Sequence, residues 1–424
     1  MARYLRGKFS IETLMYTSFS VLTLFCISAA LYSYVYVNIV SHYIQSSNVH
    51  YVDCNDKDKK NVEGMQRLEE ILDESEIREE KSEEEIDNCQ WAVRRIMGQT
   101  PYFTEDINNA ARHALAECIF KDDNKNTQTD ERQLSQIMKK KAANLKSCHR
   151  NATTHTDFKR ELHRYMNQTS SVLTQKNTKI GSMYTNLYGK SGLRLNQKMW
   201  DSLSKIQPFS KVSQFKTCAI VGNSHILKVS KCGHEIDNYE YIIRSNMPEI
   251  GKSSVDSGIR TNLTSLGPTS RTLYLENTKG EFDKAKFLKV AKEYTGHLIW
   301  IHNSMNIFNS AVFKVTDALK NHHSLKLLLA NHEYFRKFQY FLQETGQTFS
   351  TDMALIGMSI SLCEEIHLYG IWPYLIDLEA NILQPDYAAY NKLSKKENNL
   401  IAEFNLLQKL HCIGVLKIHI EKCL

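Results

Sequence analysis

Short apolar runs alternate with longer amphipathic stretches through the second half of the chain, beginning at Phe215. Runs rich in Ile, Val, Leu and Tyr predict strands buried on both faces, and the segments between them are long enough for crossover helices. The predicted strands are CAIVGN, YEYIIRSN, HLIWIHN, LKLLLAN and EIHLYGIW, which begin at Cys218, Tyr239, His297, Leu325 and Glu365. The pattern predicts an α/β domain with a largely parallel sheet at residues 215–424.

Small and polar residues follow most of these runs. Ligands of parallel α/β sheets bind beyond the carboxyl ends of the strands. We therefore expect a binding site near the strand-end residues, which are Gly222, Asn223, Ser245, Asn246, Asn303 and the segment 370–373.

The N-terminal region has an uncharged stretch from Thr13 to Val52. Its most apolar part, residues 14–37, has the ~20 residues that a helix needs to cross a membrane. Basic residues precede it and none follows until Lys57, which predicts a cytoplasmic tail at 1–13 and a type II orientation with a lumenal C-terminal domain. A cleaved signal peptide is the alternative, but the length of the apolar run favours a signal anchor.

Residues 38–88 are polar and then strongly acidic, which predicts a stem. Apolar residues near helical spacing also allow a helical stem, although the clustered glutamates favour a solvated acidic face. Residues 89–214 suggest a helical N-terminal part of the lumenal region, interrupted by a polar loop at 121–130.

The cysteines and the glycosylation tripeptides fit a lumenal chain. One of the ten cysteines, Cys26, lies in the predicted anchor, and the other nine suggest disulfides plus one unpaired or intermolecular thiol. Any single cysteine could instead be a small buried hydrophobe. The candidate N-glycosylation sites are Asn151, Asn167 and Asn262, which would have to lie at the surface.

Charge and motifs exclude several function classes. The net charge of +6 is modest, and no basic block resembles a nucleic-acid footprint. The chain has no G-x-G-x-x-G, P-loop, H-E-x-x-H or paired C-x-x-C motif. Its D-x-D triplet, Asp56–Asp58, lies in the predicted stem, so we expect no metal cofactor.

Two segments carry a family resemblance. CAIVGNSHILKVSKCGHEIDNYEYIIRSNMP, residues 218–248, resembles the large sialyl motif of animal sialyltransferases, and with SVDSGIRTNL at 254–263 it is most similar to the α2,8-sialyltransferases. FSTDMALIGMSISLCEEIHLYGIWPY, residues 349–374, resembles the small sialyl motif. The C-terminal KLHCIGVLKIHIEKC resembles the family's tail.

The resemblance implies a Rossmann-like sialyltransferase variant of a glycosyltransferase fold. It also implies metal-independent, inverting transfer of sialic acid from CMP-sialic acid to glycan acceptors on glycoproteins or glycolipids, with the protein in the Golgi membrane. By the same resemblance Cys218 pairs with Cys363, and Cys232 pairs with Cys423. The other lumenal cysteines remain unassigned, and one of them could link a dimer; they are Cys54, Cys89, Cys118, Cys148 and Cys412.

Five residues are expected to contact the donor. By position in the motifs, Asn223 and Asn246 would bind the nucleotide, because amides both donate and accept hydrogen bonds; each could instead cap a strand-end turn. Ser350 and Thr351 precede an apolar-periodic stretch, where a helix N-terminus could bind phosphate, although simple N-capping would give the same pattern. Trp372 could form a pocket wall or belong to the core.

Three positions depart from the family pattern. The histidine of the family's H-x4-E motif, which would act as general base, is replaced here by Asn398, five residues before Glu403. A second expected histidine falls on Ala388. Asp352 replaces a glycine, and a carboxylate about 4 Å from the donor phosphate would cost about 4 kcal/mol at an effective dielectric constant of 20 unless it turns outward. Two hypotheses follow: a sialyltransferase with an altered base, or a catalytically inactive binding or partner protein on the same fold.

Overall fold

The computed structural model describes residues 83–97, 105–120, 127–148, 152–166, 170–185, 192–209, 214–267, 282–301, 311–320, 324–342, 349–383 and 400–423. All of them belong to one compact unit, Gly64–Leu424. The predicted anchor and several residues singled out above lie outside this set, namely Cys54, Asn151, Asn167, Asn303, Ala388 and Asn398. None of the described helices is long and apolar enough to cross a membrane.

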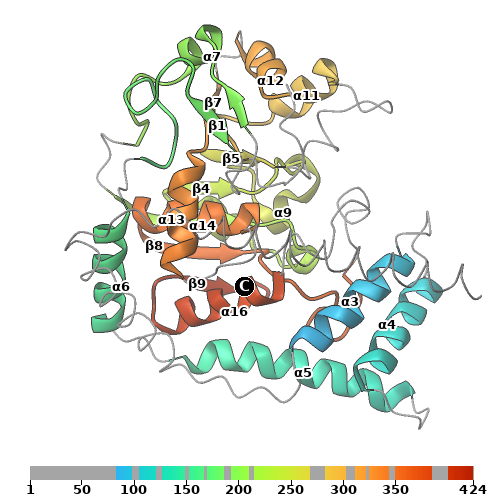
Figure 1. Ribbon diagram of the computed structural model, residues 1–424. Coiled ribbons are helices and arrows are strands. Elements are labelled where there is room, and N and C mark those ends of the chain that lie inside the picture. Colours follow the sequence, from blue (N-terminus) through green and yellow to red (C-terminus); the bar gives the residue numbers. More distant parts are fainter. Residues whose placement is uncertain are drawn as a thin grey trace, which may run out of the picture. The chain divides into compact units, whose positions relative to one another are not determined.

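A parallel sheet of seven strands forms the centre of the described residues, in the order β7-β6-β5-β4-β3-β8-β9 (Figure 1). All neighbouring strands pair in parallel. The strands are β3 (Phe215–Val221), β4 (Tyr241–Arg244), β5 (Leu263–Leu266), β6 (Gly296–Trp300), β7 (Leu325–Leu329), β8 (Cys363–Tyr369) and β9 (Lys417–His419). The predicted α/β class and the parallel sheet are confirmed.

Five of these strands coincide with the predicted runs, whereas β5 and β9 were not predicted. Strand β5 is only LTSL, and its Thr264 and Ser265 are fully buried polar residues that break the apolar pattern. Strand β9 has three residues, KIH, at the edge of the sheet, where burial alternates. Both strands are too short or too polar for periodicity to reveal them.

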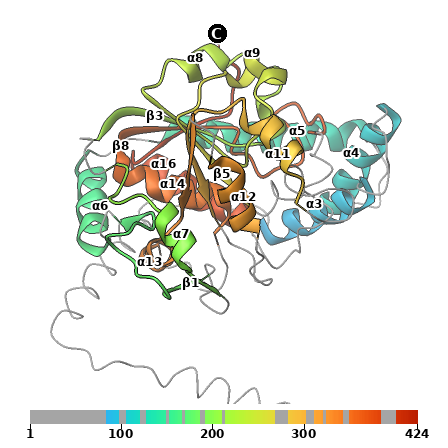
Figure 2. The same cartoon turned by 90° about the horizontal axis from the view of Figure 1, so that it is seen from above.

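The two faces of the sheet pack against different helices because successive side chains of a strand point to opposite faces. In β3, Cys218 and Ile220 belong to the large hydrophobic core, whereas Ala219 and Val221 belong to a smaller one. The large core includes α14 (Thr351–Leu362) and α16 (Leu400–Cys412), and the smaller one includes α8 (Gly233–Asp237). Figure 2 shows α8 on one side of the sheet and α14 with α16 on the other.

The remaining elements complete the two layers. A short antiparallel hairpin is formed by β1 (Met183–Thr185) and β2 (Gly192–Arg194). The other helical elements that follow this hairpin are α7 (Gln197–Ser202), η2 (His225–Leu227), η3 (Gly251–Ser253), α9 (Ser254–Ser257), α11 (Lys284–Ala291), α12 (Ala311–Leu319) and α13 (His332–Phe341). Helix α14 is buried on nearly every side, as expected of a helix between a sheet and an outer helical layer.

The N-terminal part of the described chain is helical, as predicted. Its helices are α3 (Glu83–Met97), α4 (Glu105–Phe120), α5 (Thr127–Ser147) and α6 (Ala152–Tyr165). One predicted boundary needs correction, because α5 begins inside the predicted loop. Helix α3 begins within the predicted stem, where the sequence also allowed a helix. Acidic residues are favourable in the first turn of a helix, so an acidic sequence did not exclude a helix there.

Four disulfides connect the described residues. Cys218–Cys363 joins β3 to β8, and Cys232–Cys423 joins the start of α8 to the C-terminal segment; the resemblance implies these two pairs. Cys89–Cys118 and Cys148–Cys412 use four of the five cysteines that the sequence left unassigned. A disulfide-linked dimer therefore remains a prediction for Cys54 alone among those five.

Candidate active site

Helix α14 begins directly after Ser350, whose side chain caps the helix. Ser350 Oγ accepts a hydrogen bond from the backbone N–H of Met353 at 3.2 Å. The N–H of Ser350 itself donates to Glu403 Oε1 at 2.6 Å, which joins the start of α14 to the first turn of α16. Simple N-capping, one of the two interpretations of the sequence, therefore describes Ser350.

Strand β4 ends in a turn formed by Ser245 and Asn246. Ser245 is fully buried, and its N–H donates to Val221 O of β3 at 2.9 Å. Asn246 has φ +59°, a left-handed conformation that asparagine adopts more readily than most residues. Its N–H donates to Ser265 Oγ of β5 at 2.8 Å, which fixes Asn246 at the carboxyl ends of these strands.

Three separate segments meet at Gly267, the residue after β5. A Cβ atom on Gly267 would lie 2.6 Å from Thr351 Oγ1 and 2.9 Å from Asn246 Oδ1, so only glycine lets these two polar atoms approach this backbone. We call Ser245, Asn246, Gly267, Thr351 and Asp352 the strand-end cluster. It lies at the edge of the sheet where parallel α/β proteins bind ligands.

Asp352 belongs to this cluster and does not turn outward. Its Oδ1 is shielded from solvent and has no hydrogen-bond partner among the described residues. Burial raises the pKa of the Asp352 carboxyl, and a hydrogen bond with the Ser245 side chain lowers it by less. The Ser245 hydroxyl in turn accepts a hydrogen bond from Asn246 Nδ2 at 3.0 Å, so Asp352 is linked to Asn246 through one serine.

Asn223 lies at the neighbouring strand end. It follows β3, which pairs with β4, and its side chain is exposed. The preceding residue, Gly222, packs against the backbone directly after β8, because a Cβ atom there would lie 2.4 Å from Gly370 O. The sequence therefore places Asn223 at the same edge of the sheet as Asn246, with its side chain accessible to a ligand.

Trp372 lies in the hydrophobic core. Its side chain is buried, its Nε1–H donates to Ile376 O at 2.8 Å, and its ring packs edge-on against Tyr374 and Phe404 at centroid distances of 4.8 and 5.5 Å. The core alternative therefore describes Trp372 better than a pocket wall does. The other four expected donor contacts all lie at strand or helix ends.

Asn262 is the one candidate glycosylation site within the described residues. Its Oδ1 accepts a hydrogen bond from the N–H of Ile242 at 2.8 Å, and its side chain is half-buried between β4 and β5. A glycan needs a surface amide, so this position suits glycosylation poorly. Asn151 and Asn167 stay predictions.

Among the described residues, no group of three or more His, Cys, Asp and Glu side chains could hold a metal ion.

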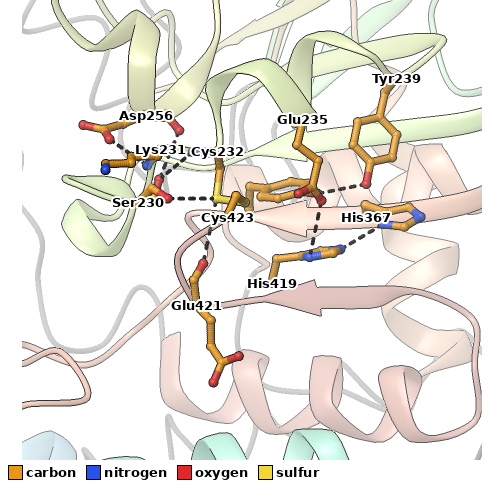
Figure 3. The surroundings of a disulfide bond; sticks show 11 residues. Ser230, Lys231, Cys232, Glu235, Tyr239, Asp256, His367, His419, Glu421 and Cys423 are labelled. Atoms are coloured by element: carbon orange, nitrogen blue, oxygen red, sulfur yellow. Dashed lines mark hydrogen bonds and ion pairs between the residues drawn. A yellow bond between two sulfur atoms is a disulfide. The ribbon is translucent and has the colours of Figure 1, made fainter.

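A second polar cluster lies beside the Cys232–Cys423 disulfide, where Figure 3 shows Glu235, Tyr239, His367 and His419. We call these four residues, together with Tyr369, whose hydroxyl contacts Glu235 and Tyr239, the tail cluster. His367 Nδ1 lies 2.9 Å from His419 Nε2, and His419 Nδ1 lies 3.9 Å from Glu235 Oε1. The Tyr369 hydroxyl donates to Glu235 Oε1 and lies 2.8 Å from the Tyr239 hydroxyl. The two histidines lie on the adjacent strands β8 and β9.

The tail cluster favours neutral imidazoles. Burial lowers the pKa of His419 to about 3, with further lowering by His367, Lys417 and His411. The pKa of His367 is lowered by burial and then by Lys417, against the opposing effects of Glu365 and Glu235. No sequence pattern marks this cluster, because His367 and His419 are far apart along the chain.

Sequence reasoning also missed Ser265, Gly267 and the role of Glu403. The first two depend on β5, which was not predicted, although the glycine directly after LTSL could have marked a strand end. Glu403 served only to align the H-x4-E motif. In the structure its carboxylate holds the start of α14, which a sequence pattern cannot show.

Comparison with known proteins gives one family. Residues 165–415 match the family described as glycosyltransferase family 29 (sialyltransferase). The chain is 31% identical to alpha-2,8-sialyltransferase 8F of Mus musculus over 261 residues, which cover 59% of this chain and 64% of that protein. It is 29% identical to alpha-2,8-sialyltransferase 8E of Homo sapiens over 282 residues, which cover 64% of this chain and 74% of that protein.

The chain thus spans slightly less than two thirds of the length of the first of these relatives. Among solved structures, it is similar to a mammalian sialyltransferase in complex with Gal-beta-1-3GalNAc-ortho-nitrophenol, with a TM-score of 0.41 and 18% identity over 61% of this chain and 93% of the other. The resemblance of the two sialyl motifs is confirmed by the family match, which covers more than half of the chain. The chain therefore belongs to glycosyltransferase family 29, the sialyltransferases.

Proposed function

We propose that this protein transfers sialic acid from CMP-sialic acid to sialylated glycans of glycoproteins or glycolipids. The relatives are named as α2,8-sialyltransferases, which supports a sialylated acceptor. The predicted anchor would hold the protein in the Golgi membrane in type II orientation, with its Rossmann-like domain in the lumen, where donor and acceptors meet.

The observation that carries the proposal is the approach of Asn246 Oδ1 and Thr351 Oγ1 to Gly267. An amide and a hydroxyl gather there at the carboxyl edge of a parallel sheet and at the start of a buried helix. Asn223 is exposed at the neighbouring strand end. We assign Asn223, Asn246 and Thr351 to the donor nucleotide, with Ser350 as the cap that orients Thr351.

The proposed reaction needs no metal in the described site. The acceptor hydroxyl oxygen forms a bond to the anomeric carbon of sialic acid, while the bond from that carbon to the phosphate oxygen breaks and CMP leaves with the electron pair. Attack from the opposite face inverts the anomeric centre. Hydrogen-bond donors aimed at the departing phosphate stabilise the charge that develops on it.

The replaced histidines affect one step, the removal of the proton from the acceptor hydroxyl. An amide such as that of Asn398 is not a base at neutral pH, and proton transfer to a positioned base typically contributes about 10²- to 10⁴-fold to the rate. We therefore expect slow transfer by the wild type, with water taking the proton of the acceptor hydroxyl, and a faster rate when Asn398→His is combined with Ala388→His.

The test is a transfer assay on the full-length protein in detergent, with labelled CMP-sialic acid and a panel of sialylated glycans. We expect acceptor-dependent incorporation above a heat-killed control, reduced about 100-fold by Asn246→Gly, because glycine keeps the left-handed backbone but removes the amide. The matched control is Asn238→Gly, at an exposed asparagine at the end of α8, which should leave transfer unchanged.

No incorporation with any acceptor by a folded wild type would contradict the transferase proposal. If the Asn398→His and Ala388→His double variant then gained transfer, the result would identify a decayed catalytic site. That outcome would favour the non-catalytic alternative for the natural chain.

A further inference from the structure

The strand-end cluster contains a carboxyl group that a site for an anionic donor does not need. Asp352 is in the first turn of α14, directly after Thr351. Its carboxyl bonds the Ser245 hydroxyl, which accepts from Asn246 Nδ2 at 3.0 Å, so a donor phosphate bound by Asn246 would lie only a few ångströms from the Asp352 carboxyl.

We propose that Asp352 couples donor binding to the uptake of one proton, so that the donor binds only when the Asp352 carboxyl is protonated. This inference rests on the proposed function, because the anionic CMP-sialic acid is its ligand. It adds a residue that sets the pH dependence of the donor site.

Three features of the geometry support the coupling. The Asp352 residue is half-buried, and its Oδ1 is shielded from solvent without a hydrogen-bond partner among the described residues, so neither water nor a described donor stabilises a charge on that oxygen. Its described hydrogen-bonding neighbour is the Ser245 hydroxyl. A protonated carboxyl gains an O–H donor, which could bond a phosphate oxygen.

The charged groups that the structure describes near Asp352 do not neutralise it. From α16, Glu403 places a second carboxylate at the start of the same helix, where it accepts from Ser350 N at 2.6 Å. From β4, Arg244 precedes Ser245, but it points to the opposite face, where its Nε donates to Arg260 O and Thr261 Oγ1. The residues at the end of β5, Ser265 and Gly267, carry no charge.

The size of the effect follows from electrostatics. Two unit negative charges about 4 Å apart at an effective dielectric constant of 20 repel by an amount equivalent to roughly a thousandfold in affinity. Protonation of Asp352 removes that repulsion. Burial already raises the pKa of this carboxyl in the free protein, which brings its titration closer to neutral pH.

The experiment measures donor binding and proton uptake by calorimetry on the full-length protein in detergent. The probe is CMP-3-fluorosialic acid, a hydrolysis-resistant donor whose phosphodiester and carboxylate stay ionised between about pH 5.5 and pH 8, so that the probe itself takes up no proton. Each pH is measured in two buffers that differ in ionisation enthalpy. The wild type should take up close to one proton, and its affinity should fall about tenfold per pH unit above the pKa of free Asp352.

Two variants and a control isolate the carboxyl group. Asp352→Asn and Asp352→Gly should bind the probe without proton uptake and with pH-independent affinity, and at pH 7.5 Asp352→Gly should bind at least about tenfold more tightly than the wild type. Asp201→Asn, which removes an exposed carboxylate at the end of α7, should behave like the wild type.

The failures can be told apart. Binding by the wild type without proton uptake, and with the same affinity as Asp352→Asn, would overturn the coupling but leave donor binding intact. Binding by Asp352→Gly alone, with no wild-type binding at the lowest pH, would also overturn it, because the carboxyl would then block the donor in both protonation states. If the folded wild type and both variants bind no probe, the proposed function itself is wrong.

Discussion

The strand-end cluster and the tail cluster lie on the same sheet but use their polar groups differently. In the tail cluster, two histidines, two tyrosines and a glutamate contact one another, and a disulfide lies beside them. In the strand-end cluster, Asn246 Oδ1 and Thr351 Oγ1 crowd against a glycine, and Asp352 Oδ1 has no hydrogen-bond partner within the described chain.

Buried polar groups that satisfy one another add stability and specify a structure, whereas one left without a partner needs another explanation. We therefore expect changes in the tail cluster to alter the free energy of unfolding and to leave donor affinity unchanged. Changes in the strand-end cluster should lower donor affinity and leave the free energy of unfolding unchanged. The experiments below test this division, beginning with the largest expected effect.

Removal of the disulfide beside the tail cluster should have the largest effect. In the chain-entropy model, Cys232→Ser with Cys423→Ser should lower the free energy of unfolding by about 5 kcal/mol, because the bridge closes a loop of 191 residues. Urea denaturation without reductant measures the free energy of unfolding. As a control, Cys89→Ser with Cys118→Ser opens a loop of only 29 residues and should cost about 4 kcal/mol. A more than tenfold loss of donor affinity in folded Cys232→Ser/Cys423→Ser protein would contradict the division.

Gly267→Ala should damage the strand-end cluster. The new Cβ would lie within 3 Å of both Thr351 Oγ1 and Asn246 Oδ1, so these two side chains must move apart. We expect transfer to fall about 100-fold, since displacement of positioning groups by about 1 Å can have that effect. Gly251→Ala is the control, because a Cβ there meets no atom within 4 Å. Unchanged transfer in Gly267→Ala would remove this cluster from the donor site.

Acidification should destabilise the tail cluster. The pKa of His419 is about 3 in the folded protein and close to 6.5 in the unfolded chain, so folding favours the neutral imidazole. Its contribution is fully present above about pH 6.5 and is lost as the pH falls, by about 2 kcal/mol at pH 5.

Denaturation curves at several pH values measure this loss. His419→Gln should reduce the slope of stability against pH by about 1.4 kcal/mol per unit below pH 6.5. Asn238→Gln, at the exposed asparagine at the end of α8, should leave the slope unchanged, because neither of these amide side chains titrates. A slope in His419→Gln equal to that of the wild type would show that His419 is not kept neutral by the fold.

Tyr239→Phe should have the smallest effect. It removes the hydroxyl that lies 2.8 Å from the Tyr369 hydroxyl but keeps the ring, so the free energy of unfolding should fall by about 1 kcal/mol. Tyr340→Phe, at a tyrosine whose side chain is 54% exposed, should change stability by much less. Donor affinity should be equal in both variants; a selective loss in Tyr239→Phe would extend the functional site into the tail cluster.

The sequence was informative where one local pattern decides the structure. The apolar runs predicted five strands, and the rule that ligands bind beyond strand ends predicted a binding site that includes Asn246. The motif resemblance gave the family and implied two disulfide pairs that the structure contains.

Prediction from the sequence failed where the structure depends on contacts between distant segments. Strand β5 is stabilised by its neighbours rather than by its own composition, so Gly267 could not be placed next to Thr351. The sequence predicts that Ser350 caps a helix, and only the fold shows that its N–H donates to Glu403. The fold likewise brings His367 and His419 together from adjacent strands, although 52 positions separate them in the sequence.

The pairing of the cysteines constrains how the chain can be made. Cys148, Cys218 and Cys232 each pair with a residue at least 145 positions later, and the partners are Cys412, Cys363 and Cys423. During synthesis these three thiols are therefore present long before their native partners. Exchange through mixed disulfides has to correct any early bond among them, a process that takes seconds to hours without efficient catalysis. The yield of correctly oxidised protein should accordingly depend on a disulfide isomerase more than on the rate of translation.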